Sequence, residues 1–374
     1  MAPVLLLALL LSTNKAVALL LNDVAASSVT NGESTLAVWT NQFSDNQAAY
    51  RVFIRLLDSP FDRNAISLGS GFRPHVATNG RDYLVAWTVQ STRFHSFRRD
   101  NCVVQTVSAH GTPGVRKVLE FTEFGGLGGA GDVAWNGTHW MVAYSYGGVS
   151  LKSRVVFLDE ALNVTSTIET GEGDVRLLER IGGRWWAFRQ EATSVTEAIE
   201  IRDDGTIGQR FAGGKIGGRF FITEGPRPLV LVQNMSDIEA IPFDPDNGFG
   251  SRRPFLASEL LFSVEPFEDG ALLLVGQSTS THIDVAFVDA SGEIRRYSPV
   301  FFPEHPQYPW ATLGTSRYGI DFFFCPDDGA DRWATGAIDL YRYALRDVAP
   351  LDPATGELVS AVNAPNDRRR AARH

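Results

Sequence analysis

The sequence is poor in the sulfur-containing residues that support several kinds of site. Its 374 residues include two cysteines and three methionines. The two cysteines, Cys102 and Cys325, lie far apart in the chain and cannot form a disulfide framework or a paired-cysteine metal site. We therefore expect both to be buried thiols.

An excess of basic residues is also missing. Lysine and arginine number 34 against 43 aspartates and glutamates, a formal net charge of -9. Non-specific contact with a phosphate backbone requires a basic surface, so nucleic acid is not an expected partner. No apolar run reaches the roughly 20 residues that a membrane-spanning helix needs. The longest candidate near the start is interrupted by Asn14 and Lys15.

The first residues nevertheless have a distinct composition. Residues 1–21 contain the apolar run Val4–Leu11, followed by Ala16-Val17-Ala18, which has the small-x-small shape of a signal-peptidase site. The usual basic residues before the apolar run are absent. Two readings stay open: a signal peptide, or an extra outer strand formed by Lys15–Leu21. The signal-peptide reading predicts a secreted, periplasmic or cell-surface protein.

The residues that are abundant favour an all-β fold. Hydrophobic residues make up 44% of the chain and charged residues 21%, which is typical of a soluble globular protein with a sizeable core. The chain also has 35 glycines and 24 phenylalanines. Many glycines and aromatic residues are expected where short strands reverse direction often.

A hairpin motif recurs along the chain. Residues 31–39 read NGESTLAVW, residues 79–87 read NGRDYLVAW and residues 136–144 read NGTHWMVAY. Asn-Gly suits a tight turn because both residues tolerate positive φ, and the apolar run that follows reads as a strand. Fainter copies follow at Gly182-Gly183, Glu224-Gly225, Asp269-Gly270 and Leu313-Gly314.

The spacing of these hairpins indicates a β-propeller. The copies recur at about the 40–50 residues of one four-stranded blade. A second turn, rich in Asp and Gly, follows each hairpin. Its copies are at Asp58, His110-Gly111, Asp159-Glu160, Asp203-Asp204-Gly205, Asp244–Gly248, Asp289–Gly292 and Asp352–Gly356.

Two turns per repeat predict four strands, A to D, with A and B joined by the first turn and C and D by the second. Residues 22–364 are therefore expected to form one propeller of four-stranded antiparallel blades. Seven blades fit best, with six or eight as alternatives. Trp39, Trp87, Tyr144 and Phe188 should fill the space between blades. Residues 365–374 are expected to form a basic disordered tail.

The first three hairpins resemble the N-G-x-x-Y-L-V-x-W blades of uncharacterised secreted bacterial β-propeller repeat proteins; residues 79–87 are the nearest copy. The resemblance implies the propeller fold and export. It implies no substrate.

Aligning strand A of every repeat places seven residues at one level of the central channel: Ser27, His75, Asp132, Leu178, Phe220, Glu265 and Pro309. His75, Asp132 and Glu265 are polar and are therefore candidate binding residues. A propeller glycoside hydrolase needs converging carboxylates. Asp132 and Glu265 are the only carboxylates at this level, and they belong to repeats three and six.

Two loops provide further candidate binding residues. The loop between strands B and C of repeat two carries a basic and aromatic patch with Arg93, His95, Arg98 and Arg99. Such a patch suits glycans, acidic polymers or a protein partner. Asp327 and Asp328 lie in the corresponding loop of repeat seven. A solvated loop is the alternative in both cases.

Several chemistries lack their motifs. The seven histidines show no metal-ligand spacing, Asp244–Gly248 reads as a structural turn rather than a calcium loop, and no nucleophile elbow or phosphate-binding loop is present. Sialidase-type propellers carry S-x-D-x-G loops, which do not occur here. Four arginines lie near predicted inner strands: Arg73, Arg176, Arg219 and Arg227. This number of arginines is expected by chance in a chain of this length.

We therefore expect no catalytic residues, metal or cofactor. The predicted function is non-enzymatic binding or scaffolding by an exported monomer that recognises a glycan or a protein through its loops. The alternative is a propeller glycoside hydrolase or lyase using the channel carboxylates Asp132 and Glu265. The sequence names neither ligand nor substrate.

Overall fold

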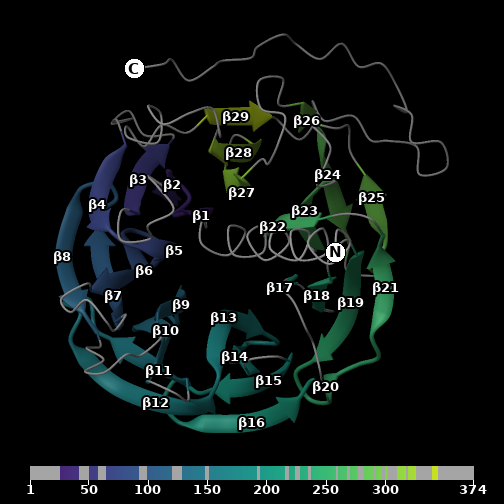
Figure 1. The fold of residues 1–374 in the computed structure, drawn as a ribbon, viewed down its shortest axis with the longest axis horizontal. Coiled ribbons are helices and arrows are strands. Elements are labelled where there is room, and N and C mark those ends of the chain that lie inside the picture. The colour runs from purple at the N-terminus through teal and green to yellow at the C-terminus, as the bar shows by residue number, and fades with distance from the viewer. Residues whose placement is uncertain are drawn as a thin grey trace, which may run out of the picture.

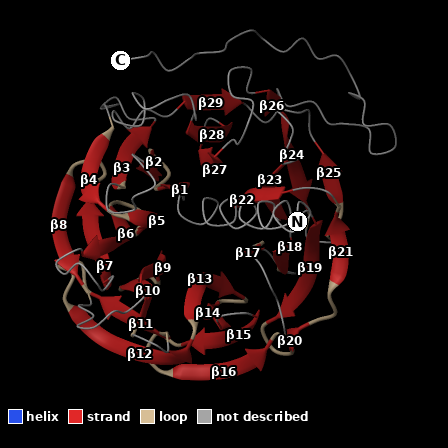
Figure 2. Cartoon of the chain, in the orientation of Figure 1, coloured by secondary structure: helices blue, strands red, loops and turns tan. Residues whose placement is uncertain are grey.

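The protein is an all-β propeller. The computed structural model describes residues 26–41, 50–57, 65–91, 99–119, 129–147, 151–191, 194–214, 219–223, 228–234, 237–257, 260–267, 270–276, 282–289, 292–296, 300–301, 310–316, 319–325 and 339–343. Every regular element in these ranges is a β-strand (Figure 2). This part of the chain has no helix of the length and apolarity needed to cross a membrane. The predicted signal peptide and basic tail lie outside it.

The first four sheets are blades of four antiparallel strands in chain order. Their strands are β1 (Ala26–Thr30), β2 (Thr35–Asn41), β3 (Arg51–Leu57) and β4 (Ile66–Ser70) in blade 1; β5 (Phe72–Thr78), β6 (Tyr83–Ser91), β7 (Arg99–Val107) and β8 (Pro113–Val118) in blade 2; β9 (Gly129–Trp135), β10 (Trp140–Tyr146), β11 (Lys152–Leu158) and β12 (Val164–Glu172) in blade 3; and β13 (Asp174–Ile181), β14 (Arg184–Glu191), β15 (Ser194–Ile201) and β16 (Ile207–Ala212) in blade 4.

The remaining sheets follow the same antiparallel plan. Blade 5 has β17 (Arg219–Ile222), β18 (Leu229–Asn234), β19 (Asp237–Asp244), β20 (Gly248–Phe249) and β21 (Arg253–Leu256); blade 6 has β22 (Leu260–Phe267), β23 (Gly270–Gly276), β24 (His282–Val288), β25 (Ile294–Arg296) and β26 (Val300–Phe301); and the closing sheet has β27 (Trp310–Ser316), β28 (Gly319–Cys325) and β29 (Asp339–Tyr343).

The sheets stand around a common axis, with the first strand of each innermost (Figure 1). Inner strands of neighbouring sheets contact each other: β1 with β5, β5 with β9, β9 with β13, β17 with β22, and β22 with β27. The ring closes where β27 meets β1. Strand β1 pairs with β2 in its own blade, so this contact is between sheets.

Six sheets in the described ranges are complete blades of four or five strands, where the sequence favoured seven. The closing sheet has three described strands. Its hairpin is also misplaced in the prediction, because Leu313 and Gly314 lie inside β27 and the chain reverses between Ser316 and Gly319. A lone glycine marks a turn or a strand interior equally well, and this repeat has no Asn-Gly pair to separate the two.

The Asn-Gly turns form because the asparagine side chain caps them. In blade 2, Asn79 Oδ1 accepts hydrogen bonds from the amides of Arg81 and Asp82 at 3.0 and 2.8 Å. Gly80 has φ +89°, a conformation that side chains disfavour. Asn31 and Asn136 make the equivalent bonds in blades 1 and 3. These local bonds explain why the motif predicted the hairpins correctly.

The turns between strands C and D also depend on side-chain caps. Asp159 accepts the amide of Asn163 at 2.7 Å, and Asp244 accepts the amide of Asp246 at 2.7 Å. We call the end of the propeller that carries both kinds of turn the turn end, and the opposite end, where the inner strands begin, the entry end.

Neighbouring blades are joined at the turn end by a recurring contact. The A–B turn of one blade meets the C–D turn of the next in three successive pairs. The paired atoms are Arg81 Nη2 and Glu160 Oε2 at 3.8 Å, Asn136 Nδ2 and Asp203 Oδ1 at 3.3 Å, and Arg184 Nη2 and Asp246 Oδ1 at 2.5 Å.

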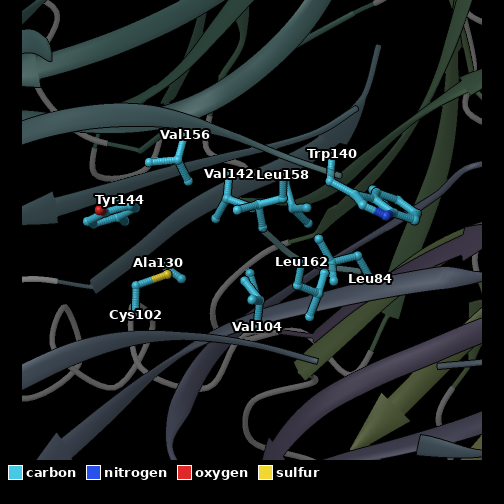
Figure 3. Close-up of a cluster of buried hydrophobic side chains, with 13 residues drawn as sticks. Leu84, Cys102, Val104, Ala130, Trp140, Val142, Tyr144, Val156, Leu158 and Leu162 are labelled. Carbon is cyan, nitrogen blue, oxygen red and sulfur yellow. The ribbon is translucent and has the colours of Figure 1, made fainter. Parts of the chain in front are cut away.

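The hydrophobic core lies between the blades. As predicted, Trp39, Trp87, Tyr144 and Phe188 are buried. The cluster between blades 2 and 3 places Trp140 and Tyr144 against strands of blade 2 and includes the buried side chain of Cys102 (Figure 3).

Phe188 differs from the other three aromatic residues in the face it occupies. Trp87 and Tyr144 pack against the preceding blade, whereas Phe188 and Trp186 pack against blade 5. The pairing of strands A and B explains the change. Tyr144 pairs with Ala130, which precedes the unpaired Gly131 of β9, whereas Phe188 pairs with Leu177, which follows the unpaired Arg176 of β13. A shift of one pair reverses the face.

Candidate functional site

Three side chains from adjacent inner strands lie at one level of the ring. His75 on β5, Asp132 on β9 and Leu178 on β13 each pair with the residue directly before the buried aromatic of strand B. This shared register is the one expected from the alignment of the repeats. The structure thus brings into contact His75 and Asp132, which the alignment placed at the same level of the channel.

The His75–Asp132 pair is half-buried. His75 Nδ1 lies 3.5 Å from Asp132 Oδ1, and the exposed fractions of the two side chains are 27% and 17%. The carboxylate also accepts the amide of Val133 through Oδ1 and the amide of Leu178 through Oδ2, both at 2.8 Å. Asp132 therefore joins blades 2, 3 and 4 at their inner strands.

These bonds define what Asp132 can do chemically. Two backbone amides donate to the carboxylate, so both of its oxygens already accept hydrogen bonds within the fold. A general acid of a glycoside hydrolase must instead hold a proton. The environment of Asp132 suits an acceptor that holds the blades together and shares a ligand hydroxyl with His75.

Just towards the entry end from this level, the inner strands of blades 2, 3 and 4 each contain a β-bulge. The unpaired residues are Arg73 with Pro74 in β5, Gly131 in β9 and Arg176 in β13. A bulge disrupts the ladder and re-aims a side chain, and bulges are frequent next to functional sites. Two of the three bulges carry an arginine.

Arg73 has a strained backbone. Its φ is +53°, one of two positive values among the described non-glycine residues. Its guanidinium lies 5.8 Å from the centroid of the Phe72 ring. Strain of this kind persists only where surrounding structure imposes it, and it concentrates at functional sites.

Arg176 is held by a half-buried carboxylate. Its Nε lies 3.1 Å from Asp174 Oδ2, and Asp174 also accepts a hydrogen bond from Ser145 of blade 3. The side chain of Arg176 is 42% exposed, against 13% for Asp174. Asp174 therefore positions the arginine while the arginine faces solvent.

A repeated polar position, missed in the sequence, joins neighbouring blades here. Thr88, directly after Trp87, accepts the amide of Ala130 in the next blade at 3.0 Å. Gln233 accepts the amide of Leu261 in the same way at 2.6 Å. The signal was present in the pairs Trp39-Thr40, Trp87-Thr88 and Tyr144-Ser145, where a polar residue follows the aromatic.

Thr40 is the exception in this series. Its hydroxyl is fully buried and has no hydrogen-bond partner within the described part of the chain. By analogy with Thr88, it should accept an amide of β5, and β2 does contact β5. The equivalent amide belongs to Arg73, whose positive φ departs from the regular strand conformation.

The remaining predicted site residues are not brought to this level by the described structure. Glu265 lies on β22 of blade 6, half-buried, and blade 6 does not adjoin blade 3. Arg99 begins β7. Arg93, His95, Arg98, Asp327 and Asp328 lie outside the described residues.

The described residues contain no cluster of three histidines, cysteines or carboxylates that could hold a metal ion. Asp244 instead uses its carboxylate to accept the amides of Asp246 and Asn247, as expected for a turn.

Comparison with known proteins establishes the fold alone. No protein-family model and no curated protein matches the chain. A solved protein from Lactobacillus plantarum has 12% identity, covering 86% of this chain and 93% of its own, with a TM-score of 0.52. The β-propeller domain of the Trilobed protease from Pyrococcus furiosus, reported to have an open velcro topology, has 13% identity, coverage of 93% and 98%, and a TM-score of 0.48. An α-L-arabinofuranosidase from Clostridium thermocellum has 10% identity, coverage of 63% and 94%, and a TM-score of 0.36.

Proposed function

We propose that this propeller is a binding protein that recognises a glycan at the inner strands of blades 2 to 4. The observation that supports it best is the His75–Asp132 pair, 3.5 Å apart on adjacent inner strands. An imidazole and a carboxylate together offer a donor and acceptors, which match a sugar hydroxyl.

A glycan fits this position better than a folded protein partner. The two side chains are only 27% and 17% exposed and lie on innermost strands, so a ligand must reach inward to touch them. The end of an extended sugar chain can do so. A folded partner would contact the protruding loops instead.

The hydrolase alternative assigns acid and base roles to Asp132 and Glu265. The two backbone amides on Asp132 favour the binding role, since they engage both carboxylate oxygens in contacts within and between blades. Release of reducing sugars that disappears in both the Asp132→Asn and Glu265→Gln variants would favour the enzyme.

The test is isothermal titration of the full chain against a panel of soluble oligosaccharides. We expect His75→Ala to weaken binding of any hit by about tenfold, the loss of one ligand hydrogen bond. His139→Ala, at the turn end, is the matched control and should bind normally. Equal loss in both variants, or none in either, would contradict the proposed site.

We propose that the chain is exported, like the secreted bacterial propellers that its N-G-x-x-Y-L-V-x-W hairpins resemble, and that it acts as a monomer. We also propose that the closing sheet is the seventh blade; its position between β22 and β1 supports this.

A further inference from the structure

The Asn-Gly turn of blade 3 differs from those of blades 1 and 2 at the residue before asparagine. In blades 1 and 2 this residue is a threonine, and its hydroxyl accepts the amide of the turn glycine. The donors and acceptors are Gly32 N with Thr30 Oγ1 at 3.1 Å, and Gly80 N with Thr78 Oγ1 at 3.0 Å. In blade 3 the same position holds Trp135, which has no hydroxyl.

The amide of Gly137, in the turn of blade 3, consequently has no hydrogen-bond acceptor within the described part of the chain. Gly137 is exposed, and a Cβ atom there would meet nothing within 4 Å. A peptide nitrogen is planar and has to leave that plane to act as a nucleophile. The threonine hydroxyl holds the peptide plane in blades 1 and 2, and this restraint is missing in blade 3.

The side-chain carbonyl of Asn136 accepts more hydrogen bonds than its equivalents do. Three groups donate to Asn136 Oδ1: Thr138 N at 3.0 Å, Thr138 Oγ1 at 3.1 Å and His139 N at 2.7 Å. The side chains of Asn31 and Asn79 each accept two backbone amides, because the residue after their glycine has no hydroxyl. Donors on a carbonyl oxygen stabilise the negative charge that develops there when the carbon is attacked.

The same hydrogen bonds bring the carboxamide of Asn136 to the nucleophile. The backbone donors are the second and third amides after Asn136, so the carboxamide folds over the turn, where the first amide, that of Gly137, also lies. Attack by this nitrogen on the side-chain carbon closes a five-membered ring. A glycine offers the least steric resistance to that attack, since it has no Cβ atom.

The other Asn-Gly pairs carry restraints that this one lacks. In blade 1, Asn31 Nδ2 donates to the carbonyl oxygen of Arg81 at 2.8 Å, which holds the amide group that would have to leave. In blade 5, Gly248 is buried and pairs with Asp244 in the strand ladder, so the nitrogen after Asn247 is enclosed. Asn136 is therefore the asparagine best placed to react.

We propose that Asn136 is a site of spontaneous modification, at which the backbone nitrogen of Gly137 attacks the side-chain carbon and forms a succinimide. The N–Cγ bond forms, the Cγ–Nδ2 bond breaks, and the proton of the glycine nitrogen leaves with the amide group as ammonia. Water then opens the ring and leaves aspartate or isoaspartate. The reaction needs no cofactor, and the inference does not depend on the proposed glycan-binding function.

The product changes the contact between blades 3 and 4. Asn136 Nδ2 now donates to Asp203 Oδ1 at 3.3 Å. After the reaction a carboxylate replaces this donor and faces the carboxylate of Asp203, and two like charges at such a distance repel each other. One of the three contacts between blades at the turn end thus becomes repulsive.

The experiment measures the rate of amide-to-acid conversion at each Asn-Gly pair. The full chain is incubated near neutral pH, digested in acid and mapped by mass spectrometry. We expect Asn136 to react at least about tenfold faster than Asn79, the effect of a free nucleophile and one additional donor on the carbonyl oxygen. Asn31 and Asn247 should react more slowly still. In urea the four rates should become similar, because only the local sequence remains.

Two variants of similar side-chain shape test the cause. Thr78→Val removes the hydroxyl that accepts the Gly80 amide and should raise the rate at Asn79 several-fold. Thr138→Val removes the third donor to Asn136 Oδ1 and should lower the rate at Asn136 without changing the rate at Asn79. Equal rates at Asn136 and Asn79 in the folded chain, or the same order of rates in urea, overturns the proposal.

A double-mutant comparison tests the consequence. Asn136→Asp reproduces the charge of the product and should lower the urea midpoint, and the loss should be smaller when Asp203→Asn is also present. Equal losses in both backgrounds contradict the proposed repulsion. His75→Ala, which tests the glycan site, should leave the rate at Asn136 unchanged, so either proposal can fail without the other.

Discussion

The two ends of the propeller are built from the same strands by different means. At the turn end, Asn79 and its equivalents satisfy backbone amides within the hairpin, and in three successive pairs of blades the A–B turn contacts the next C–D turn. At the entry end the contacts between blades use more varied groups, although the position of Thr88 and Gln233 repeats. Asp132 accepts the amide of Leu178, Asp174 accepts the hydroxyl of Ser145, and Thr88 accepts the amide of Ala130. Regular turns at one end leave the residues of the entry end free to vary, and the candidate site lies towards the entry end.

Both ends of the propeller are built on one hydrophobic core, so removing a core aromatic side chain should destabilise both ends. Trp140 is 1% exposed and packs between blades 2 and 3. We expect Trp140→Ala to lower the free energy of unfolding by about 3–5 kcal/mol. Urea unfolding measures the loss. Trp140→Phe should lower the free energy of unfolding clearly less. If hydrogen exchange showed lost amide protection at the turn end only, the two ends would not share one core.

Alanine substitutions at two glycines should destabilise the two ends for different reasons, a steric clash at the entry end and backbone strain at the turn end. At Gly131 a Cβ would meet the Val175 carbonyl oxygen at 1.9 Å, so Gly131→Ala should force blades 3 and 4 apart and cost about 2–3 kcal/mol. At Gly80 a Cβ meets nothing within 4 Å, but φ is +89°. Gly80→Ala should cost about 1 kcal/mol from backbone strain.

Thermal unfolding of both glycine variants tests this ordering. Only Gly131→Ala should also weaken oligosaccharide binding, because its displacement reaches the entry end. A larger loss of stability in Gly80→Ala than in Gly131→Ala would show that the turn contributes more to stability than the contact between blades 3 and 4.

The smallest effect should appear in acid. The side chain of Asn163 lowers the pKa of Asp159, the side chain of Thr206 lowers that of Asp204, and the amide of Asp246 lowers that of Asp244. Because these pKa values are lower in the folded chain, their stabilisation is complete above the unfolded values, about 3.9. It is lost as pH falls through the folded values.

Urea midpoints at pH 6, 4 and 3 measure this dependence. The Asp159→Asn, Asp204→Asn, Asp244→Asn variant keeps side-chain acceptors in all three turns but loses their titration. Its midpoint should fall less between pH 4 and 3 than that of the parent protein. If the urea midpoints of the variant and the parent protein fell equally with pH, other carboxylates would be responsible for the acid sensitivity.

How far the sequence predicts the structure depends on whether a feature is encoded locally. Asn79-Gly80 forms its turn from its own side-chain bonds, so the motif predicts the hairpin, the strands and the buried Trp87. The shared register then places His75 and Asp132 at one level. The bulges could not be predicted, since an unpaired residue in a strand has no composition of its own. Arg73 and Arg176 therefore looked like chance occurrences, and Leu313-Gly314 looked like a turn.

The reversed aromatic face of blade 4 has a consequence for how this ring could evolve. Because Trp186 and Phe188 face blade 5, the interface between blades 4 and 5 is rich in aromatic rings, while that between blades 3 and 4 has Ala143 and Ala187 at the matching places. A copy of blade 3 inserted in place of blade 4 would leave two voids on one side and two clashes on the other. The repeats are alike in plan, yet they are no longer interchangeable modules, and recombination between them would yield a ring that does not pack.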